Sequence, residues 1–210
     1  MILQKRPPVG NLMLQHAIAL LDTLEIPGDE SNPVIDAMWR RAGYPGIDDE
    51  TPWCGVFLAE VARRCMEPPG GMTPGYIQSI RDWFKGKSPS GDFGTFSIDS
   101  AAHSMLYIIR STYIHTGQIV IPNKPAWARH WLGFGECVWG PGDPFGQSGA
   151  KPGDVCILSR SDGGHVGLLW HDPKNGMLAI LGGNQSNSVS IKEYPLSRLL
   201  GIRRVVVSKP

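Results

Sequence analysis

The sequence predicts an α+β fold, with N-terminal helices packed on an antiparallel β-sheet in a single domain spanning residues 1–210. Apolar residues recur at helical spacing over residues 11–66, whereas short apolar runs separated by tight-turn sequences fill residues 155–207. The 26 glycines and 18 prolines favour many short elements over a helical bundle. Helices followed by hairpin-linked strands are typical of α+β proteins, because strands joined by tight turns pair antiparallel.

Two helices are expected at the N-terminus. Asn11 caps the first, whose apolar positions recur as far as Leu24. Ser31-Asn32-Pro33 predicts a capped start with proline at the first helical position, and Gly43 is typical of a helix end. We expect these two helices to pack together as an opening layer.

A third helix carries the first candidate for chemistry. Thr51 and Pro52 repeat the start signal of a cap followed by proline, which places Cys54 in the first helical turn. Unpaired N–H groups and the positive end of the helix dipole stabilise a thiolate there, so we expect Cys54 to be a nucleophile that alkylates before the other cysteines. Cys65 lies about three turns further along the helix and is expected to be a buried structural thiol.

The middle of the chain changes in character. Turn clusters surround two moderately periodic helices at residues 77–84 and 101–113, and we interpret residues 70–124 as an insertion within the domain. Residues 125–131 predict a short helix that begins at a proline. Residues 133–149 are expected to form a glycine-rich link.

The C-terminal part predicts five short strands. They are expected at residues 155–158, 165–171, 177–181, 189–194 and 202–207. His165 opens the second strand directly after Asp162-Gly163-Gly164, where its side chain emerges beside a turn. A catalytic cysteine needs a base, and imidazole titrates near neutral pH. His165 is therefore the favoured base among the six histidines.

An amide beside this strand is expected to orient the imidazole. If the second and third strands pair antiparallel, the turn containing Asn184 lies near the start of the His165 strand. Asn184 is then the expected third member of the site, although it equally fits a plain turn residue after two glycines. Gln185 and Asn187 offer the same amide chemistry and stay open as alternatives, and Gln185 has a further possible role in binding substrate near the oxyanion.

Seven short motifs occur along the chain in the order of a known family: Glu25-Ile26-Pro27-Gly28, Ser31-Asn32-Pro33, Asp49-Glu50-Thr51-Pro52-Trp53-Cys54, Ala128-Arg129-His130-Trp131, Lys151-Pro152-Gly153-Asp154, Gly164-His165-Val166-Gly167 and Gly182-Gly183-Asn184-Gln185. Together they resemble the NlpC/p60 peptidoglycan peptidases, in a phage-associated branch related to the CHAP amidases. The resemblance implies a papain-like core and a Cys-His-polar triad that cleaves amide bonds in peptidoglycan peptides. Cys54 corresponds to the nucleophile, His165 to the base and Asn184 to the orienting residue.

Other polar and aromatic residues near these motifs are weaker candidates for binding a substrate or a metal ion. Trp53 and Trp131 are expected to line the cleft and bind substrate, although large aromatic residues beside a helix start also fit a core. The acidic residues Asp48, Asp49 and Glu50 lack the ligand spacing of a calcium loop, so we expect a solvated turn. The stretch over residues 70–124 is longer than the corresponding link in the family, and no wall-binding repeat follows the strands.

Composition and charge exclude several classes of protein. Hydrophobic residues make up 41% of the chain, and 20 basic residues balance 19 acidic ones, which excludes a wholly disordered chain and leaves no electrostatic footprint for nucleic acid. No apolar stretch is long enough for membrane insertion, and the N-terminus lacks the pattern of a secretory signal. The four cysteines show neither CxxC pairing nor zinc-ligand spacing, so we expect reduced thiols, no cofactor and no metal.

The leading hypothesis is a cysteine endopeptidase or amidase that acts on bacterial peptidoglycan as a phage endolysin, a virion lysin or a delivered antibacterial toxin. Such a protein would be made in the bacterial cytoplasm without a signal peptide and would reach the periplasm or cell wall through a holin or an injection device. Two alternatives remain: an acyltransferase or deamidase of the same fold, because the triad dictates an acyl-enzyme but not the acceptor, and an inactive virion protein that uses the fold as a binding module.

Overall fold

A computed structural model describes residues 9–67, 118–161 and 163–208 of the chain. Its three α-helices are α1 (Val9–Ile18), α2 (Pro33–Arg41) and α3 (Cys54–Met66). Short 3-10 helices are η2 (Ala128–Gly133), η3 (Phe145–Gln147) and η4 (Leu196–Arg198). None of the helices in these described ranges is long and apolar enough to span a bilayer.

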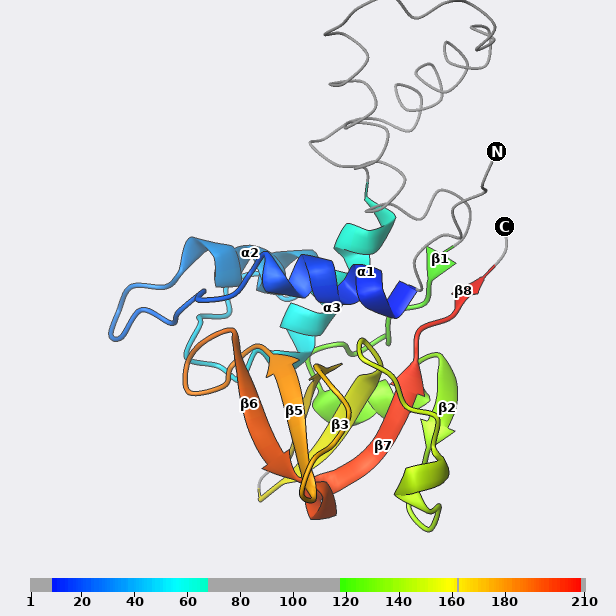
Figure 1. Cartoon of the computed structure of the whole chain (residues 1–210). Helices are drawn as coiled ribbons and strands as arrows, with labels where there is room; N and C mark the ends of the chain where they lie inside the picture. Colours follow the sequence, from blue (N-terminus) through cyan, green and yellow to red (C-terminus); the bar gives the residue numbers. More distant parts are fainter. Residues whose placement is uncertain (1–8, 68–117, 162, 209–210) are drawn as a thin grey trace, which may run out of the picture.

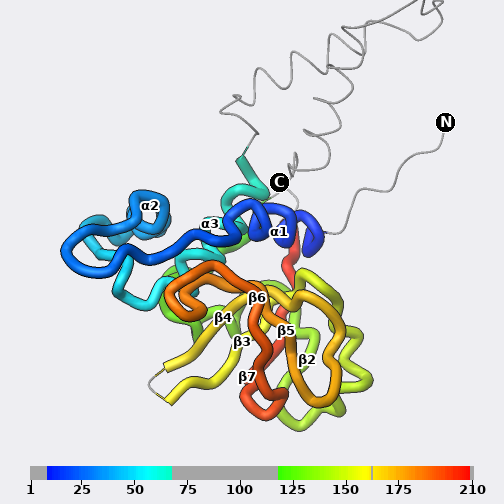
Figure 2. Tube along the Cα trace, turned by 60° about the vertical axis from the view of Figure 1, so that its left-hand side comes forward, coloured from blue at the N-terminus to red at the C-terminus, as the bar shows by residue number. Residues whose placement is uncertain are grey.

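The strands form one large antiparallel sheet and one small pair. The large sheet has six strands in the order β2-β7-β3-β4-β5-β6. Their bounds are β2 (Glu136–Trp139), β3 (Val155–Arg160), β4 (Gly163–Leu169), β5 (Met177–Gly182), β6 (Ser190–Pro195) and β7 (Leu199–Arg204). The short strands β1 (Gln118–Ile119) and β8 (Val207–Ser208) pair with each other. Figures 1 and 2 show the three helices together on one side of the large sheet. The chain is therefore an α+β protein, as predicted.

The sheet buries side chains on both of its faces. Along β3, Ile157 packs in the cluster that contains the helices, whereas its neighbours Cys156 and Leu158 pack in a second cluster with Ile180 and Ile202. This alternation follows from the two-residue period of a strand. The helix α3 is buried over most of its length, because it contacts α1, α2 and the sheet. The α3 helix is thus the centre of the first core.

The second helix confirms its sequence signals. The side chain of Asn32 accepts a hydrogen bond of 2.8 Å from the backbone N–H of Val34, and Pro33 is the first helical residue. Gly43 follows the helix with a φ of +92°, a conformation that glycine adopts without strain. The cap, the proline and the glycine therefore define α2 locally, as the sequence predicted.

The first helix ends earlier than predicted, at Ile18 instead of Leu24. The backbone N–H of Asp22 donates to the carbonyl of Val189 at 3.1 Å, and that of Glu25 donates to the carbonyl of Asn187 at 2.8 Å. These hydrogen bonds replace helical ones, so the chain leaves α1 to pair with the loop before β6. The apolar periodicity continues past the helix because Leu20 and Leu21 also pack on the core, whereas Leu24 is exposed.

The third helix begins later than predicted. Thr51 does not cap it, because its hydroxyl donates to the carboxylate of Asp48 at 3.0 Å. Trp53 occupies the cap position without a side-chain hydrogen bond, and Cys54 is the first helical residue. The start of α3 then rests directly on backbone: a Cβ at Gly55 would lie 2.1 Å from the carbonyl oxygen of Pro125.

The strands match their predictions better than the links between them. The strands β3 to β6 lie within two residues of the predicted limits, and the predicted short helix is the 3-10 helix η2. The predicted strand over residues 202–207 is divided between β7 and β8. The glycine-rich link expected at residues 133–149 contains a strand that the sequence did not predict, since β2 pairs with β7 as an edge strand.

Most of the predicted insertion at residues 70–124, with its helices at 77–84 and 101–113, lies outside the described residues. Its final part is described and contains β1, in which Ile119 is buried. The chain therefore rejoins the common core, beside α3, before the predicted end of the insertion.

The close contact at Gly55 predicts a specific loss of stability. Gly55→Ala would bring a Cβ against the carbonyl oxygens of Pro125 and Ala126, at 2.1 and 2.7 Å, and backbone atoms cannot rotate away. We expect the free energy of unfolding in urea to fall by about 1–3 kcal/mol. Gly133→Ala is the matched control, because no atom lies within 4 Å of its added Cβ. An equal loss in both variants would contradict the contact.

Candidate active site

Cys54 lies where two strands of the sheet stop pairing. The strands β4 and β5 pair only at Leu168–Leu181 and Leu169–Ile180, so the chain after β5 separates from the start of β4. The N-terminus of α3 packs beside this point. The Cys54 thiol accepts a hydrogen bond from the backbone of Val166, on the β4 side. On the other side, a Cβ at Gly183 would lie 2.5 Å from the ring of Trp53.

His165 precedes Val166 on β4, and its ring is held by a buried amide. The Nε2 atom of His165 lies 3.1 Å from Oε1 of Gln185. The amide nitrogen of Gln185 donates to the carbonyls of Ile180, at 3.2 Å, and Ser190. Because that nitrogen is committed to two carbonyls, the Gln185 oxygen must face the imidazole and accept its hydrogen. The hydrogen of neutral His165 is therefore on Nε2, which leaves Nδ1 as the basic atom.

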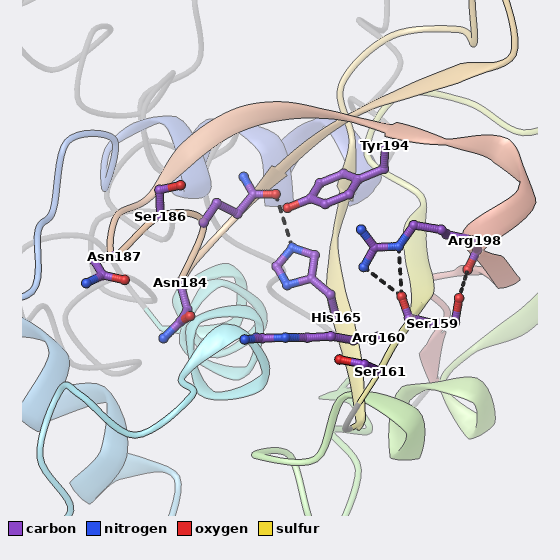
Figure 3. A pocket seen from close by; sticks show the side chains of 10 residues that line it. Ser159, Arg160, Ser161, His165, Asn184, Ser186, Asn187, Tyr194 and Arg198 are labelled. Atoms are coloured by element: carbon purple, nitrogen blue, oxygen red, sulfur yellow. Dashed lines mark hydrogen bonds between the residues drawn. The ribbon is translucent and has the colours of Figure 1, made fainter.

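A pocket of about 720 Å³ opens beside His165. Ten residues line it: Ser159, Arg160, Ser161, His165, Asn184, Gln185, Ser186, Asn187, Tyr194 and Arg198. In Figure 3 the imidazole lies between the ring of Tyr194 and the side chain of Arg160. The Tyr194 ring packs against the imidazole with centroids 5.3 Å apart and planes at 35°. The His165 ring is thus fixed by a hydrogen bond at one edge and by an aromatic face.

Burial governs the protonation of the Cys54 thiol. Cys54 is only 5% exposed, and this burial raises its pKa above the usual value. Hydrogen bonds from the backbone of Val166 and Gly55 and the positive charge of Arg160 oppose the rise without reversing it. The expectation that the helix N-terminus makes Cys54 a thiolate was therefore wrong for this structure, because the cost of desolvating the anion is larger.

Burial also keeps the imidazole neutral. Desolvation lowers the pKa of His165 to about 4, the Gln185 hydrogen bond opposes this, and the charges of Arg160 and Arg198 lower it further. At neutral pH the site thus contains a neutral thiol and a neutral imidazole, and not an ion pair. Such an imidazole is available as a general base.

The other cysteines differ from Cys54 in their surroundings. Burial alone raises the pKa of the Cys65 thiol to about 12, and burial followed by the charge of Asp154 raises that of Cys156. Both residues are fully buried in the core, which confirms the prediction for Cys65. Cys137 is exposed on the edge strand β2. Among the four thiols, only Cys54 receives pKa-lowering backbone hydrogen bonds from a neighbouring strand in the described contacts.

Asn184 does not hold the imidazole, contrary to the prediction. Its side-chain nitrogen donates to Oε1 of Glu25 at 3.0 Å, and its backbone has a φ of 55°. This left-handed turn directs residue 184 toward the start of α3, and the next residue, Gln185, meets His165 instead. Gln185 was left open as an alternative for this position. Its expected role in binding substrate gives way to holding the ring, since it is only 2% exposed.

Glu25 is a residue that the sequence reasoning missed. Its Oε1 atom accepts hydrogen bonds from the Trp53 indole at 2.8 Å and from the Asn184 amide at 3.0 Å. It thereby joins the residue before Cys54 to the residue before Gln185. Partial burial raises the pKa of Glu25, and the Trp53 hydrogen bond opposes this rise. The only signal in the sequence was its place in the Glu25-Ile26-Pro27-Gly28 motif.

Asp49 supports the same loop and is not part of a solvated turn. It is fully buried, and its Oδ2 atom accepts hydrogen bonds of 2.9 Å from the backbone N–H groups of Ile26 and Asn32. Its carboxylate replaces backbone partners that this irregular segment cannot supply. Across residues 9–67, 118–161 and 163–208, no group of three or more His, Cys, Asp and Glu side chains is arranged to hold a metal ion.

The two tryptophans expected at the cleft are core residues. Trp53 and Trp131 are both fully buried. The Trp53 indole donates to Glu25, and the Trp131 indole donates to the carbonyl of Pro125 at 2.9 Å. Both indole N–H groups are therefore satisfied inside the protein, and neither ring reaches the pocket. The only aromatic ring of the pocket lining besides His165 belongs to Tyr194 among the described residues.

Comparison with known proteins identifies no matching family model, no matching curated protein and no matching solved structure. The geometry of the site and the motifs in the sequence therefore carry the functional argument.

The held imidazole predicts an unusual titration. By ¹⁵N NMR, neutral His165 should show the Nε2–H tautomer and a protonation midpoint near about 4. Since the unfolded imidazole takes up its proton at about 6.5, the unfolded state binds more protons between these pH values, and stability falls as pH decreases through this window, by on the order of 3 kcal/mol. A midpoint near 6.5, or an Nδ1–H tautomer, would contradict the assigned hydrogen bond.

Exposure predicts the order in which the cysteines react. Exposed Cys137 should be alkylated first by iodoacetamide, which corrects the expectation from sequence that Cys54 leads. In a Cys137→Ser protein, peptide mapping should find Cys54 labelled next, because Cys65 and Cys156 are fully buried. Labelling of Cys65 or Cys156 before Cys54 in folded protein would show that the α3 N-terminus is not the accessible thiol site.

Proposed function

We propose that this protein is a cysteine hydrolase that cleaves an amide bond in bacterial peptidoglycan through an acyl-enzyme on Cys54. The observation that carries the proposal is the tautomer of His165, which the buried Gln185 amide sets so that Nδ1 is a base. This base lies on the residue next to Val166, whose backbone contacts the thiol. A thiol, a correctly protonated imidazole and an orienting amide are the parts that acyl transfer by cysteine requires.

The arrangement is that of a papain-like core, which we propose as the finer description of the fold. The thiol is at the N-terminus of a buried helix, the imidazole is on a strand of the antiparallel sheet, and the orienting amide follows the next strand of the sheet. The motifs around Cys54, His165 and Gln185 resemble the NlpC/p60 peptidases in the same order. That resemblance supports peptidoglycan as the substrate.

The first half of the reaction transfers one proton and forms one bond. Nδ1 of His165 takes the thiol proton as Sγ of Cys54 attacks the carbonyl carbon of the amide. The proton on Nδ1 then passes to the nitrogen of the leaving amine as the C–N bond breaks. The products are an amine and a thioester on Cys54. The N–H groups at the start of α3 point toward the developing oxyanion and stabilise its charge.

The second half restores the enzyme. Nδ1 accepts a proton from a water molecule, whose oxygen attacks the thioester, and the sulfur leaves and regains its proton from the imidazolium. The product is a carboxylic acid. Gln185 accepts the hydrogen bond from Nε2–H throughout, so that Nδ1 is the base in both halves of the reaction. Glu25 and Asn184 act through Gln185 and Trp53 and are positioning residues.

Digestion of purified sacculi tests the proposal. Mass analysis of soluble fragments should show a new amine and a new carboxylate at one amide bond, and Cys54→Ala and His165→Ala should abolish their release. Gln185→Ala should lower the rate by about 10–100-fold, because the ring loses its tautomer and orientation but keeps its base. Asn184→Ala should cost less than Gln185→Ala, because its contact is with Glu25.

Cys137→Ser is the matched control, since it removes an exposed thiol far from the helix start and should keep the full rate. Release of fragments by Cys54→Ala at the rate of the unmodified protein would overturn the assignment of the nucleophile. Transfer of the acyl group to an added amine in place of water would instead favour an acyltransferase, and intact sacculi after prolonged incubation would overturn peptidoglycan hydrolysis.

A further inference from the structure

The pocket beside His165 is lined by polar and positively charged side chains. Its side chains are three serines, three amides, an imidazole, a phenol and the guanidinium groups of Arg160 and Arg198. No aliphatic side chain and no carboxylate occurs among the described residues that line it. Its volume of about 720 Å³ is in the range of sites that bind small molecules or short peptides. The lining therefore suits a polar ligand that carries negative charge.

Arg198 is held in place before any ligand arrives. Its Nε and Nη2 atoms donate to the carbonyl of Ser159 at 2.9 and 2.7 Å, and its guanidinium lies 5.1 Å from the ring centroid of Tyr194. A guanidinium has five N–H donors, so these two hydrogen bonds leave donors for a ligand. A cation whose geometry is already fixed loses little conformational entropy when it binds an anion.

Arg160 brings a second positive charge to the other side of the imidazole. It ends β3, and in Figure 3 its side chain runs beneath the His165 ring, on the side away from Tyr194 and Arg198. Lys192 adds a third charge near the pocket through its hydrogen bond to Ser186. The charges of Arg160, Arg198 and Lys192 all act on His165. A negatively charged group in the pocket would interact favourably with all three.

We propose that this pocket is a subsite for a carboxylate of the substrate, bound beside the imidazole and the scissile amide and attracted by Arg160 and Arg198, which lie on opposite sides of the ring. The subsite rests on the proposed function, since it supposes a peptide substrate at Cys54, and it narrows that function to peptides with a free carboxylate next to the cleaved bond. Guanidinium groups bind carboxylates with two parallel hydrogen bonds, which gives orientation as well as affinity. A peptide whose carboxylate is capped as an amide loses this charge and one acceptor.

A matched pair of peptides tests the subsite without requiring catalysis. The probes are a peptidoglycan stem peptide with free side-chain and α-carboxylates and the same peptide with those carboxylates converted to carboxamides. Calorimetric binding to the Cys54→Ala protein should be about 10–100-fold tighter for the carboxylate form, the range expected for a charge-assisted hydrogen bond. Bound carboxylate should also move the protonation midpoint of His165 upward, which ¹⁵N NMR measures in the same protein.

Substitutions of the two pocket arginines locate the subsite. Arg160→Gln in the Cys54→Ala protein should reduce the preference for carboxylate toward one, and Arg198→Lys should reduce it partly, because the charge remains but the fork does not. Arg40→Gln removes an exposed arginine from α2 and should leave the preference unchanged. Arg198 also donates to the Ser159 carbonyl, so Arg198→Lys can lower the stability of the fold. The melting temperatures of all variants are therefore compared. If Arg198→Lys is unstable, the result for Arg160→Gln alone tests the subsite.

The outcomes separate the subsite from the proposed function. Equal affinity for the two peptides, no measurable binding of either, or a preference that Arg160→Gln and Arg40→Gln change alike would overturn the subsite. A preference that depends on Arg160, in a protein that leaves sacculi intact, would keep the subsite and overturn the hydrolase. Hydrolysis of both peptides at equal kcat/KM by the unmodified protein would keep the hydrolase and overturn the subsite.

Discussion

The short pairing between β4 and β5 is the constraint on which the site depends. The paired residues end at Leu168 and Leu181, and the start of α3 packs beside this point, against Val166 and the turn after β5. The fit around the start of α3 is close, because Gly55 faces the backbone of Pro125 and Ala126 and Gly183 faces the side chains of Trp53 and Phe57, so neither glycine has room for a side chain. This close fit brings a thiol from the helix beside an imidazole on one strand and an amide after the other.

The loop before α2 braces this junction from outside. Glu25 joins the residue before Cys54 to the turn after β5, because it accepts hydrogen bonds from Trp53 and Asn184. Asp49 holds the loop that contains Glu25, because it accepts hydrogen bonds from backbone N–H groups of that loop. Irregular backbone that lies inside a protein needs such partners, because it forms no regular ladder. Two carboxylates outside the pocket lining thus support the start of α3 and the turn that leads to Gln185.

Burial and charge act together on the pKa of His165 and oppose each other on the pKa of Cys54. Desolvation favours the neutral forms of both Cys54 and His165, so that the resting pair is a thiol and a base. The pocket beside them is strongly basic, with Arg160 and Arg198 near the ring. These charges disfavour a protonated imidazole until an anion is bound. In the proposed reaction, binding of an anionic substrate would therefore favour formation of the imidazolium.

The sequence by itself determined part of what depends on neighbouring residues, although the helix caps predicted at Asn11 and Thr51 are not formed. Periodicity and turn sequences predicted the α+β class and most strands of the sheet, and the Asn32-Pro33 start predicted α2, because caps and tight turns are local. The tertiary structure decided what depends on distant partners. The helix α1 ends earlier than predicted because the backbone N–H of Asp22 donates to the carbonyl of Val189, far along the chain. The amide that binds His165 is that of Gln185 and not that of Asn184. The left-handed turn at Asn184 packs against the start of α3 and so determines which of the two neighbouring residues reaches the imidazole.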